Sequence, residues 1–197
     1  HLRVDARLNE TKTSVILDFI TEESSVGAPF NVSALNTYSG EQGRNWYIGV
    51  KANDHIEDNW EIDAFAQGRY DLSVHGPNGF YRRFIGSKAD PDLLLTAMPE
   101  LQDNSKRYSG NLQLLLENKS NQAMEVLIAN DVYKANNKTI KVDAGAKKIV
   151  SLNLKKYHHW YNFKVKVNGH GDYLAHYAGH LETGADSVTD PYMGGVL

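Results

Sequence analysis

The stretch that decides the fold is Gly68-Arg-Tyr-Asp-Leu-Ser-Val-His-Gly-Pro-Asn-Gly-Phe-Tyr-Arg-Arg-Phe-Ile-Gly86. In its first part Tyr70, Leu72 and Val74 are apolar and alternate with polar residues. This period of two predicts a β-strand with one buried face. The segment His75-Gly-Pro-Asn-Gly79 that follows is typical of a tight turn, because Asn-Gly accepts positive φ angles. We therefore predict a hairpin of two antiparallel strands.

This stretch has a second copy later in the chain. Tyr70-Asp-Leu-Ser-Val74 recurs as Tyr161-Asn-Phe-Lys-Val165. Likewise, Phe80-Tyr-Arg-Arg-Phe-Ile-Gly86 recurs 93 positions on as Tyr173-Leu-Ala-His-Tyr-Ala-Gly179. Self-similarity at a fixed spacing indicates tandem copies of one structural unit. We expect a proline-containing boundary near 87–99, and we divide the chain into domains 1–95 and 96–197.

Each copy contains six or seven short runs with the same alternation. Trp46, Ile48 and Val50 form such a run in the first copy, and residues 112–116 and 161–167 form two in the second. No segment has a sustained helical stripe. Many short alternating runs separated by turn residues are typical of an antiparallel sandwich. The prediction is an all-β chain made of two tandem immunoglobulin-like antiparallel β-sandwich domains.

The composition argues against several classes of function. The 197 residues carry 21 Lys+Arg against 24 Asp+Glu, and this balance does not favour nucleic acid as a partner. The absence of cysteine excludes disulfides and thiolate chemistry. The sequence contains no nucleophile elbow, no phosphate-binding loop and no dinucleotide fingerprint. The longest apolar runs have strand length, and the opening His-Leu-Arg-Val is unlike a signal peptide, so we expect neither a membrane span nor an export signal in this segment.

Two groups of residues contain side chains that could bind a metal ion. Asp54-His-Ile-Glu-Asp58 is acidic, but its spacing fits no EF-hand and the aligned segment Ala146–Val150 has no carboxylate. Among the histidines between 158 and 180, His176 and His180 could share one face of a strand, with His170 added from a turn. No carboxylate accompanies them at a regular spacing. We interpret the acidic segment as a solvated turn and the histidines as surface and turn residues, and we predict no metal ion and no cofactor.

Arg82 and Arg83 lie among Phe80, Tyr81 and Phe84. Neighbouring residues on a strand face opposite ways, so one arginine points to each side. An arginine among aromatic rings can receive a phosphate group or the phosphodiester of a lipid headgroup. Alternatively, the inward arginine stacks on the rings and bonds backbone carbonyls, which would hold the last strand in place. We favour the second interpretation.

The stretch 68–86 and the later segment Gly179-His-Leu-Glu-Thr-Gly-Ala-Asp-Ser-Val-Thr-Asp-Pro191 resemble the C-terminal region of bacterial phosphocholine-specific phospholipases C. The resemblance covers essentially the whole chain. It implies two tandem copies of a small domain that follow a large N-terminal catalytic domain in a secreted or periplasmic enzyme acting on phosphatidylcholine or sphingomyelin. It assigns no catalytic residue to this segment. One departure is that the second copy has Ala175 and His176 in place of the arginine pair.

The resemblance leaves three hypotheses for what this segment does. The first is an accessory module for the membrane or the lipid headgroup, with Arg82, Arg83, Trp46, Tyr47 and Trp160 as binding residues and Tyr38 and Tyr157 as further loop aromatics. Rings at alternating positions are, however, more often core residues. The second hypothesis is a structural module that packs on the N-terminal catalytic domain of the same chain or binds an export partner. The third, a carbohydrate-binding sandwich, depends on analogy of fold.

Overall fold

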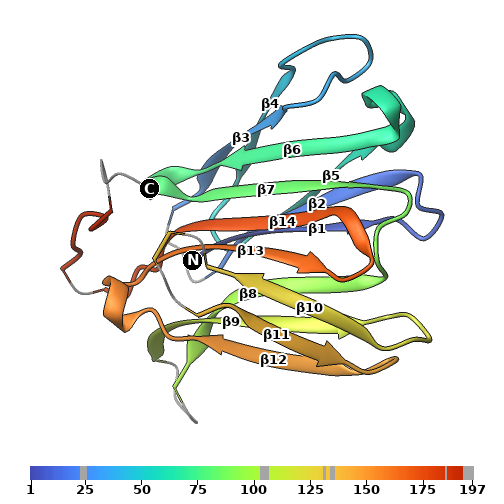
Figure 1. Cartoon of the computed structure of the whole chain (residues 1–197). Coiled ribbons are helices and arrows are strands. Elements are labelled where there is room, and N and C mark those ends of the chain that lie inside the picture. Colours follow the sequence, from blue (N-terminus) through green and yellow to red (C-terminus); the bar gives the residue numbers. More distant parts are fainter. Residues whose placement is uncertain (23–25, 103–106, 131, 134–135, 185, 193–197) are drawn as a thin grey trace.

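The computed structural model describes residues 1–22, 26–102, 107–130, 132–133, 136–184 and 186–192. The described residues contain fourteen strands, seven from each copy (Figure 1). The first seven are β1 (Leu2–Leu8), β2 (Ser14–Thr21), β3 (Ala28–Ala34), β4 (Asn45–Val50), β5 (His55–Glu61), β6 (Arg69–His75) and β7 (Tyr81–Ser87). The second seven are β8 (Leu93–Leu101), β9 (Tyr108–Asn118), β10 (Met124–Ala129), β11 (Lys138–Val142), β12 (Lys147–Leu152), β13 (Trp160–Val167) and β14 (His170–His180).

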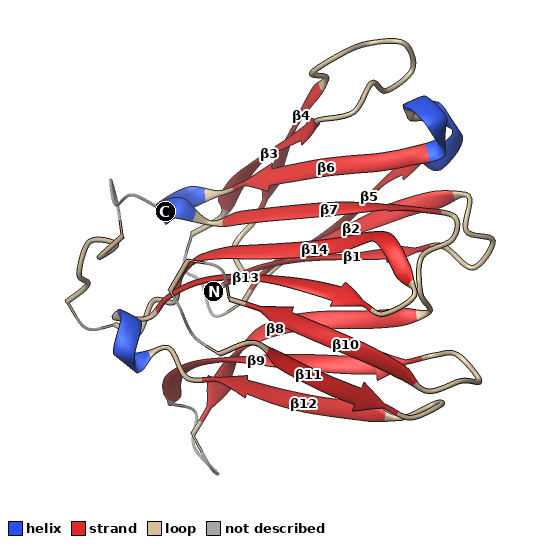
Figure 2. Ribbon diagram, in the orientation of Figure 1, coloured by secondary structure: helices blue, strands red, loops and turns tan. Residues whose placement is uncertain are grey.

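Most of the described chain forms β-strands, and its helical segments are short 3₁₀ turns near strand ends (Figure 2). These turns span Ile62–Ala64, Ala66–Gly68, Pro77–Gly79 and Lys155–Tyr157. None of the described helical segments is long and apolar enough to cross a bilayer. The predicted all-β fold is confirmed.

The strands form one large sheet and two small ones, all antiparallel. The large sheet has eight strands in the order β11-β10-β13-β14-β7-β6-β3-β4, and the small sheets have the orders β1-β2-β5 and β12-β9-β8. In Figure 1 the large sheet faces the viewer, with β1 and β2 behind it. Each copy therefore contributes a three-stranded sheet and half of the large sheet to a sandwich, as the alternation predicts. The finer expectation of an immunoglobulin-like topology stays a prediction, as does the division at residue 95.

The two copies join through their last strands, β7 and β14, which run side by side in the middle of the large sheet. Arg83 is paired with His176, the position 93 residues later that the repeat makes equivalent to it. Equivalent residues face each other in this way across a local two-fold axis. The pairing also protects both strands from being exposed edges. We call this junction the seam.

The hairpin predicted from the stretch 68–86 is present, with β6 paired to β7 in register from Arg69 opposite Ser87 to His75 opposite Tyr81. Asn78 and Gly79 have φ angles of 55° and 75°, the positive values that the turn requires. Within the stretch 87–99, β7 ends at Ser87, β8 begins at Leu93, and Pro99 lies inside β8. Proline is tolerated there because β8 is an edge strand of its sheet.

A buried acid fixes the short connection between the copies. Asp90 accepts a hydrogen bond from the backbone N–H of Ser87 at 2.8 Å and another from the hydroxyl of Tyr70. Gly86 makes room for this arrangement, since a Cβ there would lie 2.3 Å from both carboxylate oxygens of Asp90 and 2.5 Å from the Tyr70 oxygen. The connection therefore needs a residue without a side chain at position 86.

We expect Gly86→Ala to lower the free energy of unfolding by roughly 2 kcal/mol, because the added methyl group overpacks a buried site and displaces the Asp90 carboxyl group. The matched control is Gly49→Ala on β4, where a Cβ would meet nothing within 4 Å. Urea unfolding of both variants tests this. Equal midpoints for the two variants would contradict it.

Candidate functional site

The outer side of the large sheet carries a row of polar and aromatic side chains that crosses the seam. Tyr47 is opposite Asn31, Asn31 is opposite His75, and His75 is opposite Tyr81. The row continues in the second copy, where Tyr81 is paired with Ala178 and Ala178 with Asn162. Directly opposed residues of a sheet share a face. We define the open sheet face as the outward-pointing residues Tyr47, His75, Tyr81, Arg83, Trp160, Asn162, Lys166 and His176.

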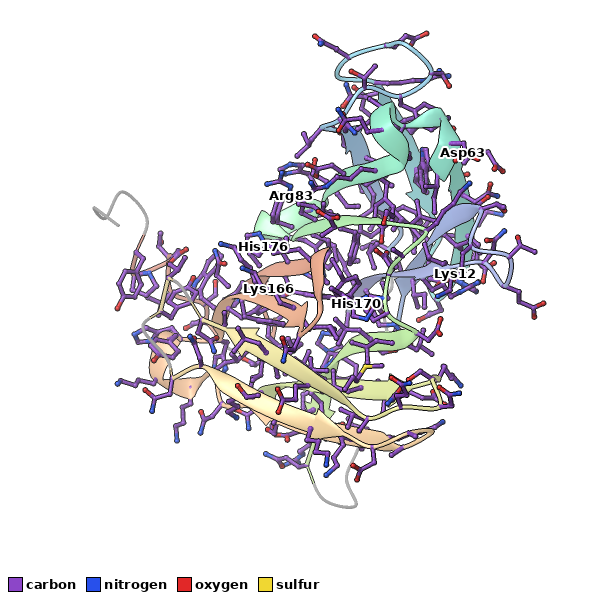
Figure 3. The ribbon with its side chains drawn as sticks, turned by 45° about the vertical axis from the view of Figure 1, so that its right-hand side comes forward. Lys12, Asp63, Arg83, Lys166, His170 and His176 are labelled. Atoms are coloured by element: carbon purple, nitrogen blue, oxygen red, sulfur yellow. The ribbon has the colours of Figure 1, made fainter. Side chains whose placement is uncertain are left out.

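Side chains on the open sheet face remain accessible. Tyr47 is 80% exposed, His75 and Lys166 are also exposed, and Tyr81 and Arg83 are half-buried. Figure 3 shows Arg83, His176 and Lys166 on the strands near the seam. The alternation along β13 sends Tyr161 into the core and leaves Lys166 outside. The face is thus an exposed surface of mixed aromatic and cationic character.

The centre of the open sheet face is held in place by specific contacts. Arg83 donates from Nε and a terminal nitrogen to the two carboxylate oxygens of Asp71, each at 2.8 Å. These bonds raise the pKa of Arg83. The ring of Tyr81 lies between those of His75 and His176, with centroids 5.0 and 5.3 Å away. Nε2 of His176 lies 2.8 Å from the side-chain oxygen of Asn162. His75, Tyr81 and Asn162 were not among the residues predicted for a site, although Tyr81 lies two positions before Arg83 on β7 and therefore shares its side of the sheet.

Arg82 points to the opposite side, into the seam, and is 2% exposed. It donates to the backbone oxygens of Tyr81 and Ala178 at 2.8 and 3.1 Å and to the Tyr161 hydroxyl at 3.0 Å. Its guanidinium carbon lies 4.0 Å from the ring centroid of Phe80 and 4.8 Å from that of Tyr177. These contacts match the interpretation that we favoured from the sequence, in which the inward arginine stacks on aromatic rings and bonds backbone carbonyls. Arg82 is therefore not on the open sheet face, and we do not retain it as a headgroup ligand.

The aromatic candidates divide in the same way. Trp46 points inward and, partly buried, packs against the core residue Trp60 and against Tyr38, with centroid distances of 5.5 and 5.3 Å. Trp160 is on the outer side, where its ring lies 4.8 Å from that of His180 and its Nε1 donates to the Val188 carbonyl at 2.7 Å. Of the five predicted residues, the structure thus places Tyr47, Arg83 and Trp160 on one face, and it buries Arg82 and turns Trp46 inward.

The acidic segment Asp54–Asp58 is mostly strand rather than turn, because β5 begins at His55. His55 and Glu57 project beside Asp18 of β2, and the ligand atoms of these three residues lie within 4.8 Å of one another. Arg7 already bonds both carboxylates of this group, Asp18 at 3.2 Å and Glu57 at 2.7 Å. It is the one group of potential metal ligands among the residues that the structure describes, and it carries no proposal.

The histidines of the second copy do not converge on a metal. His170 lies at the start of β14 and bonds the Ala89 carbonyl at 3.0 Å, whereas His180 lies at the other end of the same strand. His180 contacts the backbone oxygen of His158 at 3.1 Å, and His159 contacts that of Gly110 at 2.8 Å. These side chains serve as turn and strand contacts, in line with the interpretation from the sequence.

Two cavities, both partly open to solvent, lie at opposite ends of the seam. The Arg82 cavity, of about 350 Å³, is lined by Phe80, Arg82, Tyr161, His180 and Glu182 among others. The Asp90 cavity, of about 480 Å³, has at equivalent positions the lining residues Tyr70, Tyr173 and Ala175, which correspond to Tyr161, Phe80 and Arg82. The two cavities are therefore repeat-related but chemically different, because a guanidinium group in one is replaced by a methyl group in the other.

Comparison with known proteins gives a consistent family. A model described as the C-terminal domain of bacterial phospholipase C matches residues 1–87 and 95–180. The non-hemolytic phospholipase C of Burkholderia pseudomallei is 33% identical over 167 residues, which are 85% of this chain and 23% of that protein. The non-hemolytic and hemolytic phospholipases C of Pseudomonas aeruginosa are each 30% identical and cover 98% and 89% of this chain, and 27% and 23% of their own lengths. The chain spans about a quarter of the length of these relatives.

Proposed function

The chain belongs to the family of C-terminal domains of bacterial phospholipase C, and we propose that it acts as a non-catalytic accessory module that binds a phospholipid surface through the open sheet face. The parent enzyme would be an exported phosphodiester hydrolase acting on phosphatidylcholine or sphingomyelin. Its active site would lie in the part of the protein that this chain does not span. The partners would thus be the catalytic domain of the same protein and the membrane.

The observation that carries this proposal is the gathering of Tyr47, Arg83 and Trp160 on one accessible sheet face. Tyrosine and tryptophan prefer the level of the lipid headgroups, where an apolar ring and a polar atom are both accommodated. Cations such as Lys166 add attraction to lipid phosphates, of the order of 1 kcal/mol each near an anionic surface. Because these residues share one face of the sheet, several of them are available to a lipid surface on the same side of the molecule.

We expect the chain to co-sediment with phosphatidylcholine or sphingomyelin vesicles, and we expect Tyr47→Ala combined with Trp160→Ala to weaken the binding roughly tenfold, because each ring buries apolar area at the interface. The matched control is Ile149→Ala on β12, which removes a 64% exposed apolar side chain from a small sheet instead. Vesicle titration with and without calcium measures the effect. If binding requires calcium, Asp18, His55 and Glu57 are the candidate ligands for the ion.

Two results would contradict this proposal. One is an absence of vesicle binding under all of these conditions, and the other is an equal loss of binding in the control variant. The first would favour the alternative role, in which the tandem copies pack on the catalytic domain and stabilise it or bind an export partner. Co-purification with the separately expressed catalytic domain would then be the direct measurement.

A further inference from the structure

The Asp90 cavity lies between the two copies, away from the open sheet face. Its walls come from β1, β6, β7, β8 and β14, and about 480 Å³ is within the usual range for a ligand pocket. Four aromatic residues line it, namely Tyr70, Phe84, Tyr173 and Tyr177, together with aliphatic side chains of β1 and β8. The cavity is thus mostly apolar and rich in rings.

One buried carboxyl group is part of this lining. Asp90 is 6% exposed, and the two groups that donate hydrogen bonds to its carboxylate, Tyr70 Oη and Ser87 N–H, are both neutral. Burial raises the pKa of Asp90 to about 6, so the group is mostly ionised at pH 7. A buried carboxylate that is bonded to neutral donors is stabilised strongly by a cation placed beside it.

The cations near the cavity are engaged by other carboxylates. Lys12 pairs with Asp92 at 2.7 Å and reaches only the backbone oxygen of Asp90, at 3.3 Å. At the rim, Arg7 pairs with Asp18 and Glu57, and Lys119 pairs with Glu117. Asp90 is therefore a buried carboxylate to which none of these cations is bonded directly.

The repeat-related cavity shows what such a ring-lined site accommodates. In the Arg82 cavity the guanidinium of Arg82 lies over Phe80 and Tyr161, with centroid distances of 4.0 and 5.4 Å. Those rings thus hold a cation that belongs to the protein itself. The equivalent rings of the Asp90 cavity are Tyr173 and Tyr70, and Ala175 replaces the arginine there. The arrangement of rings that receives a cation is present twice, but only one copy supplies the cation.

We propose that the Asp90 cavity is a binding site for a small organic ammonium ion, held by the Asp90 carboxylate and by the aromatic rings of Tyr70 and Tyr173. Cation–π contacts with aromatic rings are a common means by which proteins recognise quaternary ammonium groups, and a buried carboxylate adds a charge of opposite sign. This inference does not depend on membrane binding by the open sheet face, because none of the residues involved is on that face.

The test uses tetramethylammonium and tert-butanol, a neutral molecule of similar size and shape, as probes, with isothermal titration calorimetry on the intact chain. We expect tetramethylammonium to bind and tert-butanol to bind at least roughly tenfold more weakly, because the charge supplies the selectivity. Asp90→Asn keeps the shape and an acceptor for Ser87 N–H, and it should reduce tetramethylammonium affinity by at least about tenfold. The matched control Glu10→Gln removes an exposed carboxylate at the rim and should change the affinity less than about twofold.

A pH titration adds an independent readout. Affinity should fall as the pH drops through about 6, when Asp90 takes up a proton. The titratable and charged groups that face Asp90 are Tyr70, Tyr173, Lys12 and His170. The Asp90→Asn variant cannot take up a proton at this position, so its residual affinity should not show this decrease between pH 7 and pH 5. Equal affinity for the charged and neutral probes, or undiminished binding by a folded Asp90→Asn variant, would overturn the proposal.

Discussion

We expect Arg82→Ala to lower the free energy of unfolding by roughly 3–5 kcal/mol, whereas Arg83→Ala should lower it by less than about 1 kcal/mol. The two arginines are neighbours in the sequence and have the same chemistry, so the difference comes from their surroundings alone. Arg82 is 2% exposed, whereas the side chain of Arg83 is 35% exposed. Comparing the Arg82→Ala and Arg83→Ala variants therefore shows how burial changes the effect of removing the same side chain.

The large effect at Arg82 has three physical sources. Truncation leaves the Tyr161 hydroxyl and the Ala178 carbonyl without their donor inside the seam. It opens a void between Phe80 and Tyr177, whose rings pack on the guanidinium group. Because Ala178, Tyr161 and Tyr177 belong to the second copy and Arg82 to the first, the contacts of Arg82 with these three residues hold the copies together. Loss of Arg83 breaks only a half-exposed ion pair with Asp71.

Urea unfolding followed by far-UV circular dichroism measures both changes. If Arg82→Ala does not fold, Arg82→Met provides the comparison, since it keeps most of the volume and removes the charge and the donors. We expect its stability to lie between that of the wild type and that of Arg82→Ala. Equal effects at positions 82 and 83 would show that the seam does not depend on the buried guanidinium.

The local structure was predictable from the sequence because alternation and turn residues act over a few positions. Tyr70, Leu72 and Val74 are buried as their period of two predicts, and Asn78-Gly79 forms the expected turn. The family, too, is marked by the same stretch and is confirmed by the match over both copies. The period of two also predicted that one of Arg82 and Arg83 would point inward. It did not say which one, because aromatic residues flank the pair on both sides.

The relation between the copies was not predictable, because the residues that pair β7 with β14 look like those of any half-buried strand. The open sheet face exists only through that pairing, since it brings His176 of the second copy beside Arg83 of the first. The acidic segment shows the opposite case. Asp54–Asp58 was interpreted as a turn from its charge, but Ile56 and Trp60 alternate with polar residues and place most of it in β5.

The second large effect concerns pH, and we expect the protein to be more stable near pH 5 than near pH 8. Asp5 lies at the junction of β1 and β8, where it accepts hydrogen bonds from the Ala97 N–H at 3.3 Å and the Tyr177 hydroxyl at 3.4 Å. Burial raises the pKa of Asp5 to about 7, and the nearby Arg3 and Arg82 offset this only in part. Asp18 of β2 adds to the rise. The folded protein therefore keeps a proton on Asp5 that the unfolded chain releases near pH 4.

The direction of the effect follows from this proton. A folded-state pKa above the unfolded value gives stability that is fully present below about pH 4 and is lost as the pH rises towards 7. Asp90, whose pKa is raised to about 6, acts in the same direction. Glu57, Glu100 and Glu117 have lowered pKa values and act oppositely, but they lose their stabilising effect only as the pH falls through their own acidic range. The window between pH 5 and 8 thus isolates the two buried aspartates.

Urea midpoints at pH 5, 6, 7 and 8 test this, and the loss of stability across the series should be roughly 2–4 kcal/mol for the wild type. Asp5→Asn keeps an acceptor for the Ala97 N–H and cannot ionise, so its stability should decline much less, with the remainder due to Asp90. Asp63→Asn is the control, because Asp63 is exposed and pairs with Lys88 at the surface. Its decline should match that of the wild type. A wild type as stable at pH 8 as at pH 5 would mean that Asp5 is ionised throughout, held by Arg3, and that the junction of the two small sheets contains an ion pair rather than a protonated acid.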